Sequence, residues 1–205
     1  DTAVRLGQIA TRSFESFAPN AATFGDALDL PHSVRETVYE RVREKLAREP
    51  VEDCRIDFED GYGFRPEAEE DGHAAAAASE LAAAYKKKRG TAFSGFRTKS
   101  FSKETYGRAV KTLEIFLTTL LNEAKDGLPD NFFITLPKVT DPKEVKDLCR
   151  RLASFEKTRG LPRNAIGVEL MIETPEAIID KKGRLRVRDL VDAAAPRPRR
   201  RRPGE

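Results

Sequence analysis

The stretch CRIDFEDGYG, residues 54–63, decides the fold class, because it has the pattern of a short strand that ends among acids and glycines. Apolar side chains alternate with polar ones at Cys54, Ile56 and Phe58, as in a strand whose two faces differ. Residues 57–63 hold three carboxylates and two glycines. Crowded carboxylates cost Coulomb energy unless a cation neutralises them. This strand end therefore needs a positive partner from elsewhere in the fold.

Strand-like and helix-like segments take turns along the rest of the chain. Further strands are predicted at 93–99, 132–136 and 166–172, and the middle one is a continuous apolar run typical of a strand buried on both faces. Helices are predicted at 31–48, at 67–88, over the apolar stripe from Val110 to Leu121, after Asp141 and after Thr174. This order favours a parallel sheet built from right-handed crossovers.

The length and the charge distribution indicate one domain followed by a basic tail. The 205 residues are enough for one core and too few for two large domains. The net charge is +3, but the five arginines and one glutamate of residues 193–205 contribute +4, which leaves −1 for residues 1–192. The body therefore lacks a nucleic-acid footprint. We predict that the proline- and arginine-rich tail is disordered, and we interpret it as the frame-shifted or artificial end of a longer gene.

Cysteine usage and hydropathy exclude several other classes. The two cysteines lie far apart and form no CxxC motif, so neither a disulfide framework nor a zinc site is indicated. No apolar stretch approaches the roughly 20 residues of a membrane span, and no signal-peptide pattern is present. We expect a cytoplasmic protein without a membrane partner.

Charged residues mark the ends of the four predicted strands. The markers are Glu59, Arg97, Lys138 and Glu173, and they are separated by 38, 41 and 35 residues. Ligands bind at the carboxyl edge of parallel strands, both in open doubly wound sheets and in closed barrels. Two cations among several carboxylates suit a divalent metal ion together with an anionic substrate.

Four motifs at these strand ends resemble, in order, those of the citrate lyase β-subunit/HpcH-HpaI aldolase superfamily. They are DFEDG at 57–61, GFRTKSF at 95–101, ITLPKV at 134–139 and VELMIETPEAI at 168–178. The resemblance implies a (β/α) TIM barrel, of which this chain holds about four of the eight strand-helix units. It also implies a bacterial carbon-carbon lyase or aldolase that depends on magnesium or manganese, forming a homo-oligomer when full length.

The resemblance assigns the metal ligands. Glu173 matches the glutamate that ligates the metal directly, and Glu59 with Asp60 matches an acidic pair near the metal. Glu169 lies on the same strand face as Glu173. It would be the inward-facing metal ligand instead of Glu173 if the strand register slips by one pair of residues. The aspartate that this superfamily carries on the following strand has no counterpart in this sequence.

The same resemblance assigns the substrate contacts. Arg97 would hold the carboxylate of a 2-oxo acid or of an acyl-CoA-type thioester, while the metal stabilises the developing enolate. Lys138 either contributes to catalysis at the pocket edge or forms a structural ion pair. Gly61 would let the backbone turn over the substrate. Lys99 is read as an exposed charge of the strand edge.

Three functional classes remain open from the sequence. The first is the magnesium-dependent lyase acting on a small carboxylate substrate. The second is a non-catalytic half-barrel that binds partners without a complete metal site. The third is weak nucleic-acid binding through the arginines of residues 197–202. This class ranks last because no aromatic residue lies between those arginines.

Overall fold

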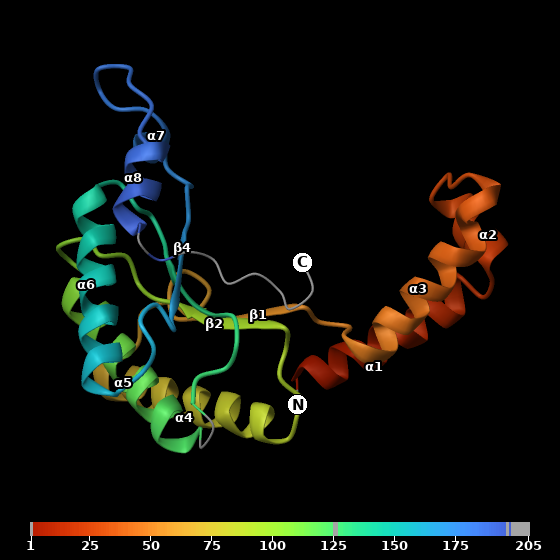
Figure 1. Ribbon diagram of the computed structural model, residues 1–205, viewed down its shortest axis with the longest axis horizontal. Coiled ribbons are helices and arrows are strands. Elements are labelled where there is room, and N and C mark those ends of the chain that lie inside the picture. Colours follow the sequence, from red (N-terminus) through yellow and green to blue (C-terminus); the bar gives the residue numbers. More distant parts are fainter. Residues whose placement is uncertain (1, 125–126, 196, 198–205) are drawn as a thin grey trace. The chain divides into compact units, whose positions relative to one another are not determined.

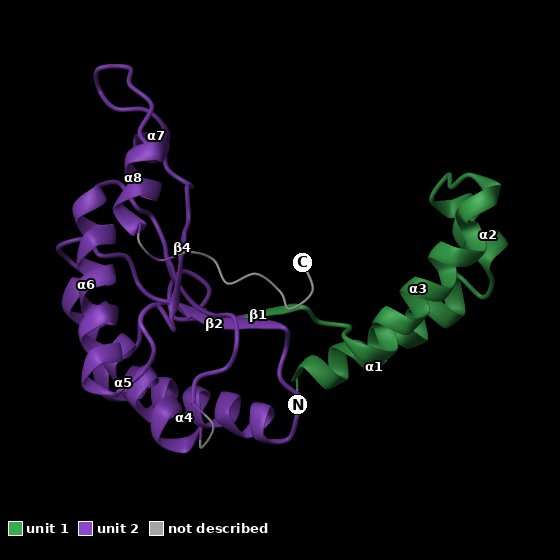
Figure 2. Cartoon of the chain, viewed as in Figure 1, with its two compact units in different colours: residues 1–54 green, residues 55–205 purple. Residues whose placement is uncertain are grey.

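A computed structural model describes residues 2–124, 127–195 and 197 (Figure 1). The chain divides into two compact units, residues 1–54 and 55–205 (Figure 2), and the boundary falls inside the first strand. No helix in these described ranges is both long and apolar enough to cross a membrane.

The N-terminal unit is helical. It contains α1 (Thr2–Phe17), α2 (Ala21–Ala27), the 3-10 turn η1 (His32–Val34) and α3 (Arg35–Arg48). The ring of Phe14 lies 5.4 Å from that of Phe24 and 5.1 Å from that of Tyr39, so one aromatic cluster joins the three helices. The helix predicted at 31–48 is confirmed, with a 3-10 turn as its first residues.

The second unit alternates strands and helices as predicted. It begins within β1 (Asp53–Asp57) and continues with α4 (Glu67–Lys86), β2 (Phe93–Arg97), α5 (Tyr106–Glu123), β3 (Phe132–Leu136), α6 (Pro142–Thr158), β4 (Gly167–Leu170), α7 (Pro175–Ile178) and α8 (Val187–Ala194). The four strands form one sheet in the order β1-β2-β3-β4, and β2, β3 and β4 run parallel. The predicted α/β class is therefore confirmed.

One face of the sheet carries the core. Phe58, Phe96, Phe132 and Ile134 are buried there among apolar residues of α4, α5 and α6. The ring of Phe96 lies 4.2 Å from that of Phe116 on α5. Every residue of β3 is buried, which confirms the prediction from its continuous apolar run.

Charged side chains occupy the opposite face of the sheet. Arg55 Nε of β1 lies 3.4 Å from Glu169 Oε2 of β4, and the Arg55 guanidinium lies over the ring of Phe133. A Cβ atom at Gly95 would overlap the Phe133 carbonyl, and one at Gly167 would overlap the Phe133 ring. The two glycines therefore leave room for Phe133, and side chains of the first and fourth strands meet across the sheet.

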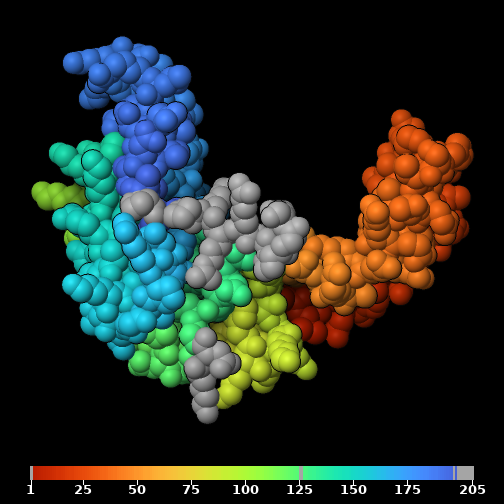
Figure 3. Space-filling model, viewed as in Figure 1, coloured from red at the N-terminus to blue at the C-terminus, as the bar shows by residue number. Residues whose placement is uncertain are grey.

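The last helix continues into the segment predicted to be a disordered tail. α8 ends at Ala194 and contacts α6, which lies beside the C-terminal helices in the space-filling view (Figure 3). Arg197 is buried against Glu156 of α6, with Nη1 2.8 Å from Oε1. The predicted tail boundary at residue 193 is therefore wrong for these positions. Residues 196 and 198–205, with the remaining arginines, lie outside the described part of the chain.

Candidate functional site

Asp57, the last residue of β1, shapes the acidic turn that follows it. Its Oδ1 accepts the amide of Glu59 at 2.9 Å, and its Oδ2 accepts the amide of Gly61 at 3.0 Å. Aspartate side chains commonly fold the following backbone into such turns. A Cβ atom at Gly61 would lie 2.5 Å from Asp57 Oδ2, so only glycine fits without a shift. The predicted turn is present, and its Gly61 amide donates to Asp57.

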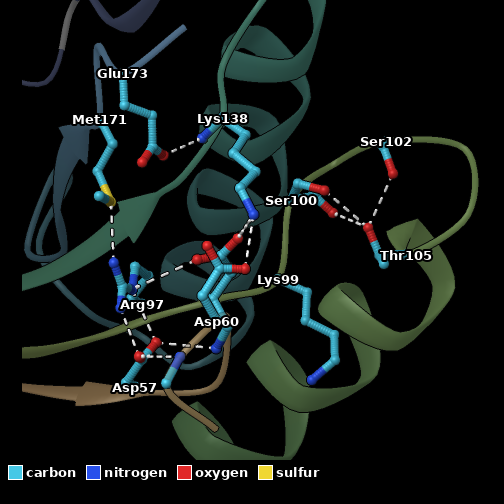
Figure 4. Close-up of polar contacts among 12 residues, drawn as sticks. Asp57, Asp60, Arg97, Lys99, Ser100, Ser102, Thr105, Lys138, Met171 and Glu173 are labelled. Carbon is cyan, nitrogen blue, oxygen red and sulfur yellow. Dashed lines mark hydrogen bonds and ion pairs between the residues drawn. The ribbon is translucent and has the colours of Figure 1, made fainter. Parts of the chain in front are cut away.

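Arg97, the last residue of β2, is held by the same aspartate. Its Nε donates to Asp57 Oδ1 at 2.8 Å and its Nη2 to Oδ2, while Nη1 points to Met171 Sδ at 3.6 Å (Figure 4). The Arg97 hydrogen bonds hold the pKa of the Asp57 carboxyl below its usual range. The side chain predicted to bind substrate therefore has a fixed orientation, with Nη1 as the donor that faces away from Asp57.

Lys138 connects three of the predicted site residues. Its ammonium lies 2.6 Å from Glu59 Oε1 and 2.7 Å from Asp60 Oδ1, and its backbone amide donates to Glu173 Oε1 at 2.7 Å (Figure 4). The hydrogen bonds to Asp60 and Glu59 raise the pKa of the ammonium well above its usual range. The cation that the acidic cluster requires is thus supplied by the end of β3.

The structure favours Glu173 over Glu169 as the carboxylate of this site. Glu173 follows β4 and reaches Lys138, as described above. Glu169 lies within β4, in register with Thr135, whose hydroxyl donates to Glu169 Oε2 at 2.7 Å. Glu169 thus belongs to the polar face inside the sheet and Glu173 to its carboxyl edge.

Glu59 retains one unsatisfied oxygen. Its side chain is 6% exposed, and Oε2 is buried without a hydrogen-bond partner, 4.0 Å from Arg97 Nε. A buried carboxylate oxygen in this state is costly and attracts a cation or a proton donor. Asp60 differs, because its side chain is 69% exposed. Within the described residues, no group of three or more His, Cys, Asp or Glu side chains is arranged around a metal position.

Lys99 has a different role from the one predicted. It is buried and not exposed, and its ammonium pairs with Glu70 at 2.9 Å and donates to the Phe58 carbonyl at 2.8 Å. These contacts connect the end of β2 to α4 and to the residue that follows β1. Lys99 is therefore a structural residue.

Asp57 is the site residue that the motifs did not single out as a participant. Its signal in the sequence is an aspartate two residues before Glu59 and four before Gly61, a spacing that favours a side-chain-capped turn. Its pairing with Arg97 joins residues 40 positions apart and has no local signal.

Comparisons with known proteins give one match. No curated protein and no solved structure matches the chain. A family model described as a domain of unknown function, DUF6986, matches residues 1–201, which span both compact units. The chain therefore belongs to the DUF6986 family.

Proposed function

We propose that the sheet forms half of a (β/α) barrel. Three observations support this arrangement over an open doubly wound sheet. The strands follow one another in sequence order, without the reversal that marks a doubly wound sheet. The helices α4, α5 and α6 share one core with a single face of the sheet. Arg55 of β1 contacts Glu169 of β4, and curvature of the sheet toward its polar face would favour this contact.

We infer further that the carboxyl edge of the sheet is the site of a magnesium-dependent carbon-carbon lyase or aldolase. The proposed substrate is a 2-oxo acid or an acyl-CoA-type carboxylate. The observation that carries the proposal is the convergence of Glu59, Asp60 and Glu173 on Lys138, beside the fixed guanidinium of Arg97. Carboxylates and oriented cations at the carboxyl ends of parallel strands are typical of sites that bind small anions with a metal.

The donor set fits a hard divalent cation. Glu59 and Asp60 present oxygens to one position, and the buried Glu59 Oε2 lacks a hydrogen-bond partner. Glu173 uses Oε1 for the Lys138 amide. Glu59 and Asp60 would hold the ion together with water, as magnesium is commonly bound, and Glu173 would add its carboxylate from the end of β4, with manganese as a substitute for magnesium. When bound, the ion would act as a Lewis acid on the substrate keto oxygen and so favour the enolate.

The protein's own residues would orient the substrate. Asp57 fixes two donors of Arg97, so the guanidinium presents Nη1 without having to become ordered on binding. This preorganised donor would hold the substrate carboxylate. Lys138 adds a second positive charge at the same edge, where it would contact an anionic group of the substrate.

Enolate formation itself provides the test. The purified protein is incubated with pyruvate and Mg²⁺ in D₂O, and exchange of the methyl protons is followed by NMR. We expect exchange that requires Mg²⁺ and is lost in Glu173→Gln. The matched control is Glu176→Gln, which changes an exposed glutamate three residues away in α7. An exchange rate that is the same in Glu173→Gln and Glu176→Gln contradicts the proposal. So does an exchange rate of the wild type that is the same with and without Mg²⁺.

A non-catalytic half-barrel is the second candidate function. It is favoured by Lys138, whose ammonium already pairs with both Glu59 and Asp60, and by the lack of a three-ligand metal group among the described residues. This candidate predicts no saturable Mn²⁺ binding and no proton exchange. The lyase proposal requires saturable Mn²⁺ binding as well as proton exchange.

A further inference from the structure

The Lys138 ammonium occupies the position where the two acids of the turn converge. One nitrogen lies within hydrogen-bond distance of both Glu59 and Asp60, at 2.6 and 2.7 Å. The Lys138 ammonium therefore takes the place that a bound cation would take between these oxygens. The second oxygen of Glu59 is buried beside it without a hydrogen-bond partner.

The backbone at Lys138 is fixed in an unusual conformation. Its φ is +50°, in the left-handed region that non-glycine residues seldom adopt. The Glu173 carboxylate holds the amide of the same residue at 2.7 Å. Strained conformations of this kind persist where the surroundings fix them, and they cluster at ligand sites. The backbone is thus anchored by Glu173, while the four-carbon side chain can change its direction.

We propose that the Lys138 ammonium is a built-in occupant of the cation position between Glu59 and Asp60, which a divalent ion fills only by displacing it. The inference rests on the proposed function, because it requires that position to bind a metal ion. The displaced ammonium remains at the carboxyl edge of the sheet, where Arg97 also lies. It is then available to an incoming anionic substrate.

This exchange links the metal to the substrate. Without the ion, the Lys138 ammonium pairs with both Glu59 and Asp60 and is not free to bind an anion. With the ion bound, both carboxylates are satisfied and one more cation faces the substrate. By linkage, the metal raises the affinity for the anion, and the anion raises the affinity for the metal by the same factor. The metal and the anion are therefore expected to bind cooperatively.

The first experiment measures Mn²⁺ affinity directly. Free Mn²⁺ is quantified by EPR during titration of the wild-type protein, Lys138→Gln and Lys146→Gln. Lys146 is an exposed lysine of α6, so its replacement removes the same charge away from the acidic turn. We expect Lys138→Gln to bind Mn²⁺ about tenfold more tightly than the wild type, because the competing ion pair is gone. Lys146→Gln should stay within about twofold.

The second experiment needs no variant and so does not depend on how Lys138→Gln folds. The wild-type protein is acetylated briefly with acetic anhydride, with and without Mn²⁺, and each lysine is quantified by mass spectrometry. The Lys138 side chain is 42% exposed, so the reagent reaches it in both states. Displacement predicts faster modification of Lys138 when Mn²⁺ is bound and an unchanged rate at Lys146.

The outcomes separate this inference from the proposed function. Tighter Mn²⁺ binding by Lys138→Gln, with faster labelling of Lys138 in the wild type, supports both. If the wild type binds Mn²⁺ but the labelling of Lys138 does not change, displacement is overturned and the metal site is retained. The same conclusion follows if folded Lys138→Gln binds Mn²⁺ with equal or weaker affinity than the wild type. Absence of Mn²⁺ binding in the wild type and in folded Lys138→Gln overturns the metal-dependent function and the inference with it.

Discussion

Replacing Arg197 with methionine tests the most deeply buried ion pair that the structure describes. The side chains of Arg197 and Glu156 are each 2% exposed. Arg197 donates to both Glu156 oxygens, at 2.8 and 3.1 Å, and to the carbonyls of Ile166 and Cys149 at 2.7 and 3.3 Å. Methionine fills a similar volume but provides neither the charge nor the donors.

The expected cost follows from what the substitution leaves behind. Glu156 would keep its hydrogen bonds from the amides of Asn164 and Ile166 but would lose the guanidinium of Arg197. Removing one partner of a buried pair typically costs about 3–5 kcal/mol, because the other charge stays buried. With a urea m-value of roughly 2 kcal/mol/M, the midpoint of the transition should fall by about 2 M.

Urea unfolding followed by circular dichroism is the suitable assay, because the chain contains no tryptophan. Glu156→Gln combined with Arg197→Met should be less destabilised than Arg197→Met alone, since no buried charge remains. The control is Arg188→Met, which breaks an exposed pair with Asp192 at 3.1 Å and should cost less than about 1 kcal/mol. A loss in Arg197→Met no larger than in this control refutes the burial of the pair.

Two further predictions concern the acidic turn. Gly61→Ala should lower the free energy of unfolding by about 1–3 kcal/mol, because the added Cβ atom would meet Asp57 Oδ2. Gly72→Ala should instead raise the free energy of unfolding by about 0.5–1 kcal/mol, because Gly72 lies inside α4 and no atom lies within 4 Å of the added Cβ position. Equal effects in urea unfolding would contradict the close approach at Gly61. Because Arg97 lowers the Asp57 pKa from its ordinary value of 3.8, this carboxylate stabilises the fold above that pH and loses its contribution as the pH falls through the lowered pKa. The stability advantage of the wild type over Asp57→Asn should therefore be constant above about pH 5 and shrink below pH 3.8, and an advantage independent of pH would refute the pairing.

Much of the fold was predictable because it depends on local patterns. Alternating apolar residues gave β1, the continuous apolar run gave the fully buried β3, and Asp141 with Pro142 correctly marked the start of α6. These patterns reflect which side of an element faces the core, a property fixed by neighbours a few residues apart.

The candidate site was predictable only in part. Glu59, Asp60 and Lys138 meet as expected, because residues at the carboxyl ends of neighbouring parallel strands share one edge. The role of Lys99 differs from the prediction, because its ammonium is buried and pairs with Glu70. A strand pattern specifies the face of a side chain but not its hydrogen-bond partner.

The sequence by itself determined the order of strands and helices in the second unit, the full burial of β3 and the charged residues at the carboxyl edge of the sheet. Only the tertiary structure decided that Arg97 pairs with Asp57, 40 residues away, that Lys99 donates to the Phe58 carbonyl, 41 away, and that Arg197 pairs with Glu156, 41 away. The physical reason is that periodic burial is encoded within one element. An ion pair depends instead on the distance between atoms of different elements, which is set when the whole chain packs.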